Sequence, residues 1–225
     1  MDQYLTKVTL SDGEYERKMI KTHLITKNDN IVQVLQGVVG GEVSGDDIVF
    51  VSERIVAISQ GRSYPINTIH PSRMAVFLSN HVNKTKAGIG LGSPWTMELA
   101  LRETNVMRIL FAAFVAAITR PLGIKGLFYR VAGNNVNAID GPTSNTIAPY
   151  NTHAKLGPRN PDKAARELAQ ALGVRVAIVD SNDLGMNVLG RSDRSLTDKF
   201  CTEVFKGNPF GQNDEQTPVA IIRKI

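Results

Sequence analysis

Two aspartates stand at positions in the sequence that suit metal or phosphate chemistry. Asp140 and Asp180 each follow an apolar run with strand character, and small polar residues come after each of them. Mg²⁺ and similar hard cations bind oxygen ligands and are usually held by one or two carboxylates together with substrate phosphates. Ser181 and the side-chain amide of Gln212 are further oxygen donors in the same half of the chain. The alternative role for a single aspartate beside a glycine is a turn cap, which is the commoner one.

General base catalysis is a second interpretation of these carboxylates. Two carboxylates that face a nucleotide repel it unless a metal ion offsets their charge, and metal ions also polarise phosphoryl oxygens, so metal binding is the better hypothesis. The four histidines lack ligand spacing such as His-Glu-x-x-His, which disfavours zinc. The sequence therefore predicts a site for hard divalent cations.

The elements that must position the two aspartates are short strands among helices. Residues 48–51 predict a central strand, and residues 174–179 form the clearest strand pattern in the chain. Residues 127–132 and 136–140 also have strand character, whereas residues 161–172 carry the apolar spacing and end signals of a helix. Because strands and helices mix without a regular βαβ alternation, we predict an α+β fold with mixed sheets and packed helices.

The remaining composition indicates a soluble protein of the cytoplasm. The single cysteine, Cys201, excludes an internal disulfide and suits a reducing compartment. The N-terminus lacks the charged and then apolar build of a secretion signal. The longest apolar run, Met107 to Ile118, is shorter than the roughly 20 residues that cross a bilayer, so it predicts a buried helix and we expect no membrane partner.

The net charge of +5 and the pI near 9.4 raise the question of nucleic acid binding. The basic residues are scattered, and no basic strand with interleaved aromatic residues resembles an RNA-binding motif. We therefore expect no nucleic-acid partner. A mildly basic surface suits anionic small substrates equally well.

Five segments of the chain form an ordered set of motifs: residues 24–31, residues 47–62 with their closing Gln60-Gly61-Arg62, residues 138–145, residues 179–182 and residues 211–218. In this order they resemble the motifs of the coenzyme F-420 gamma-glutamyl ligase family. The resemblance covers most of the chain. It implies the family's α+β gamma-glutamyl ligase fold as a single domain over residues 1–225, with a smaller substrate-side subdomain within about residues 63–130, in an intertwined homodimer.

The same resemblance implies a GTP-dependent ligase that activates an acceptor carboxylate as an acyl phosphate and couples it to L-glutamate. It implies two divalent ions per subunit, Mg²⁺ or Mn²⁺, with K⁺ as a further candidate ion. Carried over position by position, the resemblance implies that Asp140 and Asp180 bind one metal ion and that Ser181 and Gln212 bind the other. The nucleotide-contacting positions are Lys21, Thr22, His23, Leu24, Ser52, Glu53 and Asn145.

This sequence also departs from the family pattern. Ile58 and Ser59 stand where the family commonly has a phosphate-binding lysine, and Arg54 is the nearest cation. The choice between GTP and ATP therefore stays open, and so does a non-catalytic nucleotide-binding regulator. The middle of the chain, residues 88–130, matches the deazaflavin enzymes poorly, which leaves a folate polyglutamylating ligase as an alternative.

Overall fold

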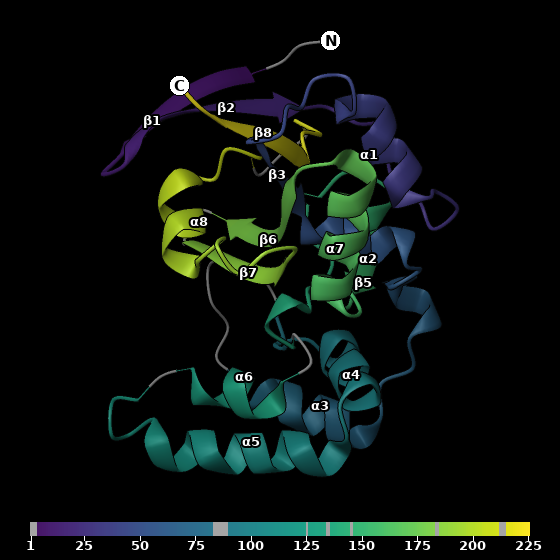
Figure 1. The fold of residues 1–225 in the computed structure, drawn as a ribbon. Coiled ribbons are helices and arrows are strands. Elements are labelled where there is room, and N and C mark those ends of the chain that lie inside the picture. The colour runs from purple at the N-terminus through teal and green to yellow at the C-terminus, as the bar shows by residue number, and fades with distance from the viewer. Residues whose placement is uncertain are drawn as a thin grey trace. The chain divides into compact units, whose positions relative to one another are not determined.

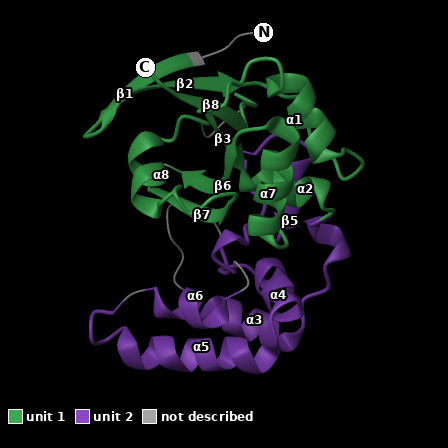
Figure 2. Cartoon of the chain, viewed as in Figure 1, with its two compact units in different colours: residues 1–61, 158–225 green, residues 62–157 purple. Residues whose placement is uncertain are grey.

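Two compact units make up the chain in this computed structural model. Unit 1 comprises Met1–Gly61 and Pro158–Ile225, and unit 2 comprises Arg62–Gly157 (Figure 2). The region expected to hold a smaller subdomain, residues 63–130, falls inside unit 2. The structure describes residues 4–82, 90–124, 126–133, 136–144, 146–182, 185–211 and 215–225.

Unit 1 is built around a mixed sheet with the strand order β1-β2-β8-β3-β6-β7 (Figure 1). The strand pair β3 and β6 is parallel, and the other neighbours in the sheet are antiparallel. The strands are β1 (Tyr4–Leu10), β2 (Gly13–Ile20), β3 (Ile48–Ser52), β6 (Arg175–Asn182), β7 (Gly185–Arg191) and β8 (Val219–Lys224).

Helices cover both faces of this sheet. Helix α8 lies on one face, while α1, α2 and α7 lie on the other (Figure 1). On the α8 face, the rings of Phe50 in β3 and Phe205 after α8 stack with their centroids 4.9 Å apart, and both side chains are fully buried. The helices of unit 1 are α1 (Ile31–Val39), α2 (Glu53–Ser59), α7 (Pro161–Leu172) and α8 (Asp198–Val204).

Unit 2 is mainly helical, with a small two-stranded sheet. Its core gathers apolar side chains such as Met97, Ile109 and Ile139. Arg62, only 4% exposed, donates from Nε to the Gly157 carbonyl at 2.6 Å and from Nη2 to Glu103 at 2.7 Å. The elements are β4 (Ser63–Pro65), η1 (Ile66–Thr68), α3 (Arg73–Asn80), α4 (Pro94–Glu103), α5 (Val106–Thr119), α6 (Leu127–Ala132), η2 (Val136–Ala138), η3 (Tyr150–Thr152) and β5 (His153–Lys155).

The structure confirms the α+β class and the strongest element predictions. The runs at 48–51 and 174–179 become β3 and β6, whose central residues are buried on both faces as parallel strands require. Helix α7 starts at Pro161, whose fixed φ suits the first helical turn, and ends at Gly173 with φ +73°, a conformation that glycine adopts without strain.

Two strand predictions in unit 2 are wrong. Residues 127–132 form the helix α6 between Gly126 and Gly133, both with positive φ, and the helix packs its apolar side chains on the unit 2 core. Residues 136–138 form a 3-10 turn, and Asp140 makes an isolated bridge with Lys155. Asp140 therefore does not follow a strand. The prediction failed because a short apolar run fits a buried turn as well as a strand.

The apolar run at 107–118 forms a helix, α5, but the prediction that it is buried is wrong. Only Ile109 and Ala112 of α5 are buried, whereas Met107, Phe111 and Phe114 are 72%, 59% and 60% exposed. In the part of the chain that the structure describes, no helix has both the length and the apolar character needed to span a membrane.

The thiol of Cys201 is enclosed in the unit 1 core. It is fully buried in α8, and burial raises the pKa of Cys201 to about 11. The thiolate is the reactive form, so the folded chain should resist a disulfide reagent at about pH 8. We expect one thiol to react only after denaturant is added, as measured by release of the reagent's chromophore. Rapid reaction of the native protein would contradict this burial.

Candidate active site

The candidate site lies at the edge of the unit 1 sheet where β3 ends. In the parallel pair, Val51 is opposite Ile178 and Ser52 is opposite Val179. The chain leaves this edge through Ser52 into α2, while β6 continues for Asp180, Ser181 and Asn182 beside β7. The carboxyl ends of parallel strands are the usual location of ligands in such sheets. The register therefore places Ser52 and Asp180 at the same edge.

Two further segments reach the same edge from the antiparallel side of the sheet. Ile20 at the end of β2 and Val51 near the end of β3 both pair with Val219 at the start of β8. Residues 21–24 leave β2 at this edge, and residues 216–218 enter β8 there. The Ser52 amide donates to the Pro218 carbonyl at 2.8 Å, which ties these segments together.

The segment after β2 is held by a reciprocal contact with Gln216. The Thr22 amide donates to the Gln216 carbonyl at 3.3 Å, and Gln216 Nε2 donates to the Thr22 carbonyl at 2.8 Å. Thr22 is 6% exposed, and Gln216 adopts φ +56° to make this contact. Four chain segments thus meet through backbone pairing and backbone hydrogen bonds, so the sheet sets the relative positions of their backbones.

Eight of the eleven predicted site residues belong to this edge of unit 1: Lys21, Thr22, His23, Leu24, Ser52, Glu53, Asp180 and Ser181. Asp140 lies in unit 2. The predictions for Asn145 and Gln212 fall outside the described residues.

Ser52 and Glu53 begin helix α2 at this edge. Ser52 is the helix N-cap, and its hydroxyl accepts from the Arg54 amide at 3.4 Å. Glu53 is 4% exposed, and a buried carboxylate is costly unless it is paired or hydrogen-bonded. Asp180 shares a strand face with the buried Val176 and Ile178, because side chains alternate along β6.

His23 is engaged with a neighbouring carboxylate. Its Nε2 atom is 2.9 Å from Asp29 Oδ1, and Asp29 Oδ2 accepts from the Thr26 amide at 2.7 Å and from the Thr26 hydroxyl at 2.8 Å. The Thr26 hydroxyl and then His23 lower the pKa of Asp29 by hydrogen bonding. The His23 ring, 56% exposed, is therefore oriented by an ionised aspartate.

Asp140 and Lys155 form a polar pair in unit 2 that the sequence analysis missed. The Asp140 amide donates to the Lys155 carbonyl at 3.1 Å, and the Lys155 amide donates to the Asp140 carbonyl at 2.9 Å. Asp140 Oδ1 accepts from the Gly141 amide at 2.8 Å, which is a turn-cap contact. Lys155, 4% exposed, donates from Nζ to the Ala138 carbonyl at 2.9 Å. Its apolar neighbours Ala154 and Leu156 are a weak sequence signal of burial.

A metal ion at the unit 1 edge would rely on few protein carboxylates. Within the described ranges, no group of three or more His, Cys, Asp or Glu side chains is arranged to hold a metal ion. Asp180 and Glu53 carry carboxylates in the segments that meet at this edge, whereas Ser181, the next residue of β6, carries its hydroxyl on the other strand face. An all-oxygen set with two carboxylates fits Mg²⁺ better than zinc, because Mg²⁺ keeps waters and phosphate oxygens in its shell.

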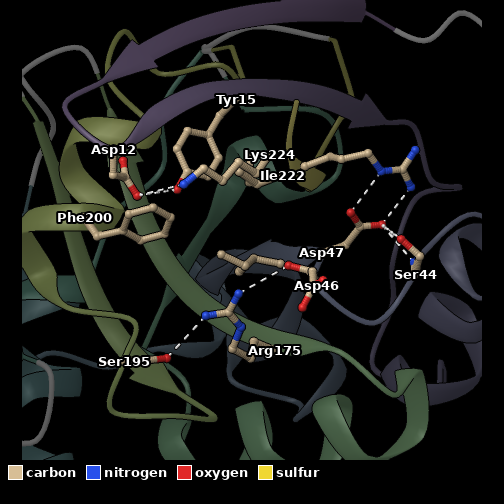
Figure 3. Close-up of a pocket in the computed structure, with 12 residues that line it drawn as sticks. Asp12, Tyr15, Ser44, Asp46, Asp47, Arg175, Ser195, Phe200, Ile222 and Lys224 are labelled. Carbon is tan, nitrogen blue, oxygen red and sulfur yellow. Dashed lines mark hydrogen bonds and ion pairs between the residues drawn. The ribbon is translucent and has the colours of Figure 1, made fainter.

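The opposite edge of the unit 1 sheet carries a separate cavity, shown in Figure 3. Its volume is about 700 Å³, and it contains none of the predicted site residues. Asp47 in its wall is 2% exposed and accepts from Arg223 twice, at 2.9 Å from Nε and 2.7 Å from Nη2. The Ser44 amide adds a bond of 2.8 Å to the same carboxylate. These contacts anchor the loop before β3 to β8.

Comparison with known proteins supplies the class of this site. A sequence model of the F420-0:Gamma-glutamyl ligase family matches residues 19–183, which is more than half of the chain. The protein belongs to this family and is a ligase enzyme. The match includes every predicted site residue except Gln212. No curated protein matches the chain.

The buried carboxylate of Asp47 should contribute to stability in a pH-dependent way. Burial acts to raise the pKa of Asp47, but hydrogen bonds from Arg223 and Ser44 hold it below the ordinary value of 3.8. The contribution is complete above that value and is lost as the pH falls through the lower pKa of the folded state. We expect Asp47→Asn to reduce the free energy of unfolding by about 1–3 kcal/mol near pH 7. Urea titrations check this.

The same titrations at acidic pH supply the control. The difference between the two proteins should shrink as the pH falls from 3.8 through the lower pKa of folded Asp47, because below that pKa both proteins carry a neutral side chain at this position. Asp46→Asn, at the neighbouring exposed residue, should change the unfolding free energy by less than about 0.5 kcal/mol. A pH-independent loss in Asp47→Asn would contradict the ionic role.

Proposed function

We propose that the protein forms an amide bond between an acidic acceptor carboxylate and L-glutamate, with a nucleoside triphosphate, preferably GTP, and divalent metal ions. The meeting of residues 21–24, 52–53, 180–181 and 216–218 at one sheet edge is the observation that supports this proposal. Family membership supports the reaction type. Assembly as a homodimer is part of the proposal.

The chemistry of the edge residues supports a metal-bound triphosphate. Asp180 and Ser181 are the proposed protein ligands in unit 1, and Glu53 is a second carboxylate at the same edge. When bound, Mg²⁺ or Mn²⁺ neutralises triphosphate charge and polarises the phosphoryl oxygens. The proposed roles of Asp140 and Gln212 as ligands, and of Asn145 as a nucleotide contact, rest on the family resemblance alone.

Positive charge for the triphosphate comes from positions other than Ile58. Ile58 is 4% exposed in α2 and packs into the core, so this position supplies no cation. Lys21 is exposed directly after β2, and Arg54 lies in the first turn of α2, so both belong to segments that meet at the site edge. These two cations are the proposed substitutes for the family lysine.

The proposed reaction has two steps. An oxygen of the acceptor carboxylate attacks the γ-phosphorus, the bond to the nucleoside diphosphate breaks, and an acyl phosphate forms. The amine of L-glutamate then attacks the acyl carbon, phosphate leaves, and the amine releases a proton. In both steps the protein acts mainly by positioning and by stabilising negative charge.

A nucleotide-binding regulator is the second candidate function. The burial of Ile58 favours it, because a weakened phosphate site can retain binding while turnover is lost. Within the ligase class, a folate is the alternative acceptor to a deazaflavin. The same assay separates these candidates.

The central test is phosphate release by purified protein with Mn²⁺, GTP or ATP, L-glutamate and a deazaflavin or folate acceptor. Asp180→Asn should reduce release by at least about 100-fold, because a lost metal ligand removes several kcal/mol of transition-state stabilisation. Glu53→Gln should also reduce it. A coupled phosphate assay measures both changes.

Asp46→Asn is the matched control, since it makes the same chemical change at an exposed position of unit 1 away from the site edge. Its activity should equal that of the wild type. Circular dichroism establishes that each variant is folded. Nucleotide binding by calorimetry without phosphate release across all acceptors would favour the regulator, and the absence of both would refute the proposal.

A further inference from the structure

Helix α5 presents an apolar stripe to solvent. Met107, Phe111, Phe114 and Ile118 follow one another at helical spacing, so they lie along one side of the helix. Each is at least half exposed, and Leu122 just after the helix is 71% exposed. We call these five residues, with the partly exposed Leu110, the apolar face. Contiguous apolar surface of this kind on a folded protein marks a docking site.

The other side of α5 is where the helix packs within unit 2. Ile109 and Ala112 enter the unit 2 core, and α6 packs along the helix. Figure 2 shows α3, α4 and α6 on one side of α5 in unit 2. Helix α3 adds exposed apolar residues of its own, with Phe77 at 62%. The exposed stripe therefore belongs to a helix already anchored in a folded unit.

Unit 2 is also strongly basic. Residues 62–157 contain ten Lys and Arg and three Asp and Glu, a net charge of +7, while the rest of the chain carries −2. No acidic residue occurs between Glu103 and Asp140, the segment that forms α5 and α6. Arg108, Arg120 and Arg130 in this segment are exposed. The partner of the apolar face should therefore be apolar and negatively charged at the same place.

We propose that the apolar face binds the surface of an anionic lipid bilayer. Aromatic and aliphatic side chains with flanking arginines are the composition of helices that lie in the membrane interface. Anionic headgroups attract basic segments, and this attraction weakens with salt. A second copy of the chain is the less suitable occupant, because it would bring two units of charge +7 together. The expectation of no membrane partner rested on the lack of an apolar run long enough to span a bilayer, and it does not concern binding to the membrane surface.

Vesicle flotation of the full chain tests this proposal. We expect the protein to float with phosphatidylcholine vesicles that contain about a third phosphatidylglycerol, and to float poorly with phosphatidylcholine alone. Bound protein should fall as salt is raised from about 0.05 M to about 0.5 M. The double variant Phe111→Ser with Phe114→Ser should lose at least about 10-fold in binding, because two aromatic contacts are removed.

A matched double variant, Leu5→Ser with Ile225→Ser, removes two apolar side chains of similar exposure from unit 1 and should float like the wild type. Arg120→Gln with Arg130→Gln should reduce the salt dependence. Thermal melting checks that all variants are folded. Equal flotation of the wild type and the Phe111/Phe114 variant overturns the proposal. So does a dimer in lipid-free buffer, seen by sedimentation, that the Phe111/Phe114 substitutions convert to monomer.

Discussion

The parallel pairing of β3 with β6 is the constraint on which unit 1 depends. β3 lies between β8 and β6, and its first four residues are buried, so its backbone groups are paired on both sides. A shift of one residue would turn every side chain of the strand to the other face of the sheet. The single register that avoids this also places Ser52, where the chain leaves the sheet, opposite Val179 and so beside Asp180, the next residue of β6.

The buried layers on the two sides of this pair reinforce the same register. Phe50 and Val179 contribute to the cluster beneath α8, while Val49 and Ile178 point to the opposite face. Gly190 in β7 shows how closely α7 is seated, since a Cβ atom there would lie 2.3 Å from the Pro161 backbone. The Arg191 amide donates to Asp162 in the same contact at 2.9 Å. The apolar side chains on the two faces of the sheet thus fix the level of the edge at which the candidate site lies.

The sequence predicted the elements of unit 1 better than those of unit 2. β6 and α7 carry signals that are complete within their own residues: a continuous apolar run, and an early proline with a glycine at the end. The segments 127–132 and 136–140 carry no such signal, because their conformation depends on packing against α5 and on the bridge to Lys155. Exposure of α5 was equally unpredictable from composition, since an apolar helix looks the same whether or not a partner covers it.

The candidate site shows the same division. Asp180 was found from the pattern of its own strand, but the proximity of Thr22 to Ser52 requires the pairing of three strands distant in sequence. In the sequence, only the family resemblance indicates that Thr22 and Ser52 belong to one site. Lys155 was missed because a single lysine between apolar residues is rarely informative without the position of Asp140.

The place of β8 in the sheet bears on how the protein is made. This strand pairs with both β2 and β3, yet residues 219–224 follow all the other described elements in the chain. During synthesis, the backbone groups of β2 and β3 that pair with β8 stay unpaired until residues 219–224 leave the ribosome. Unpaired strand edges can pair with other chains. Unit 2 is one continuous stretch and can complete its folding earlier. We therefore expect a stage of synthesis in which unit 2 is already complete as a chain while the sheet of unit 1 still lacks β8, and a chaperone would be of most use at that stage.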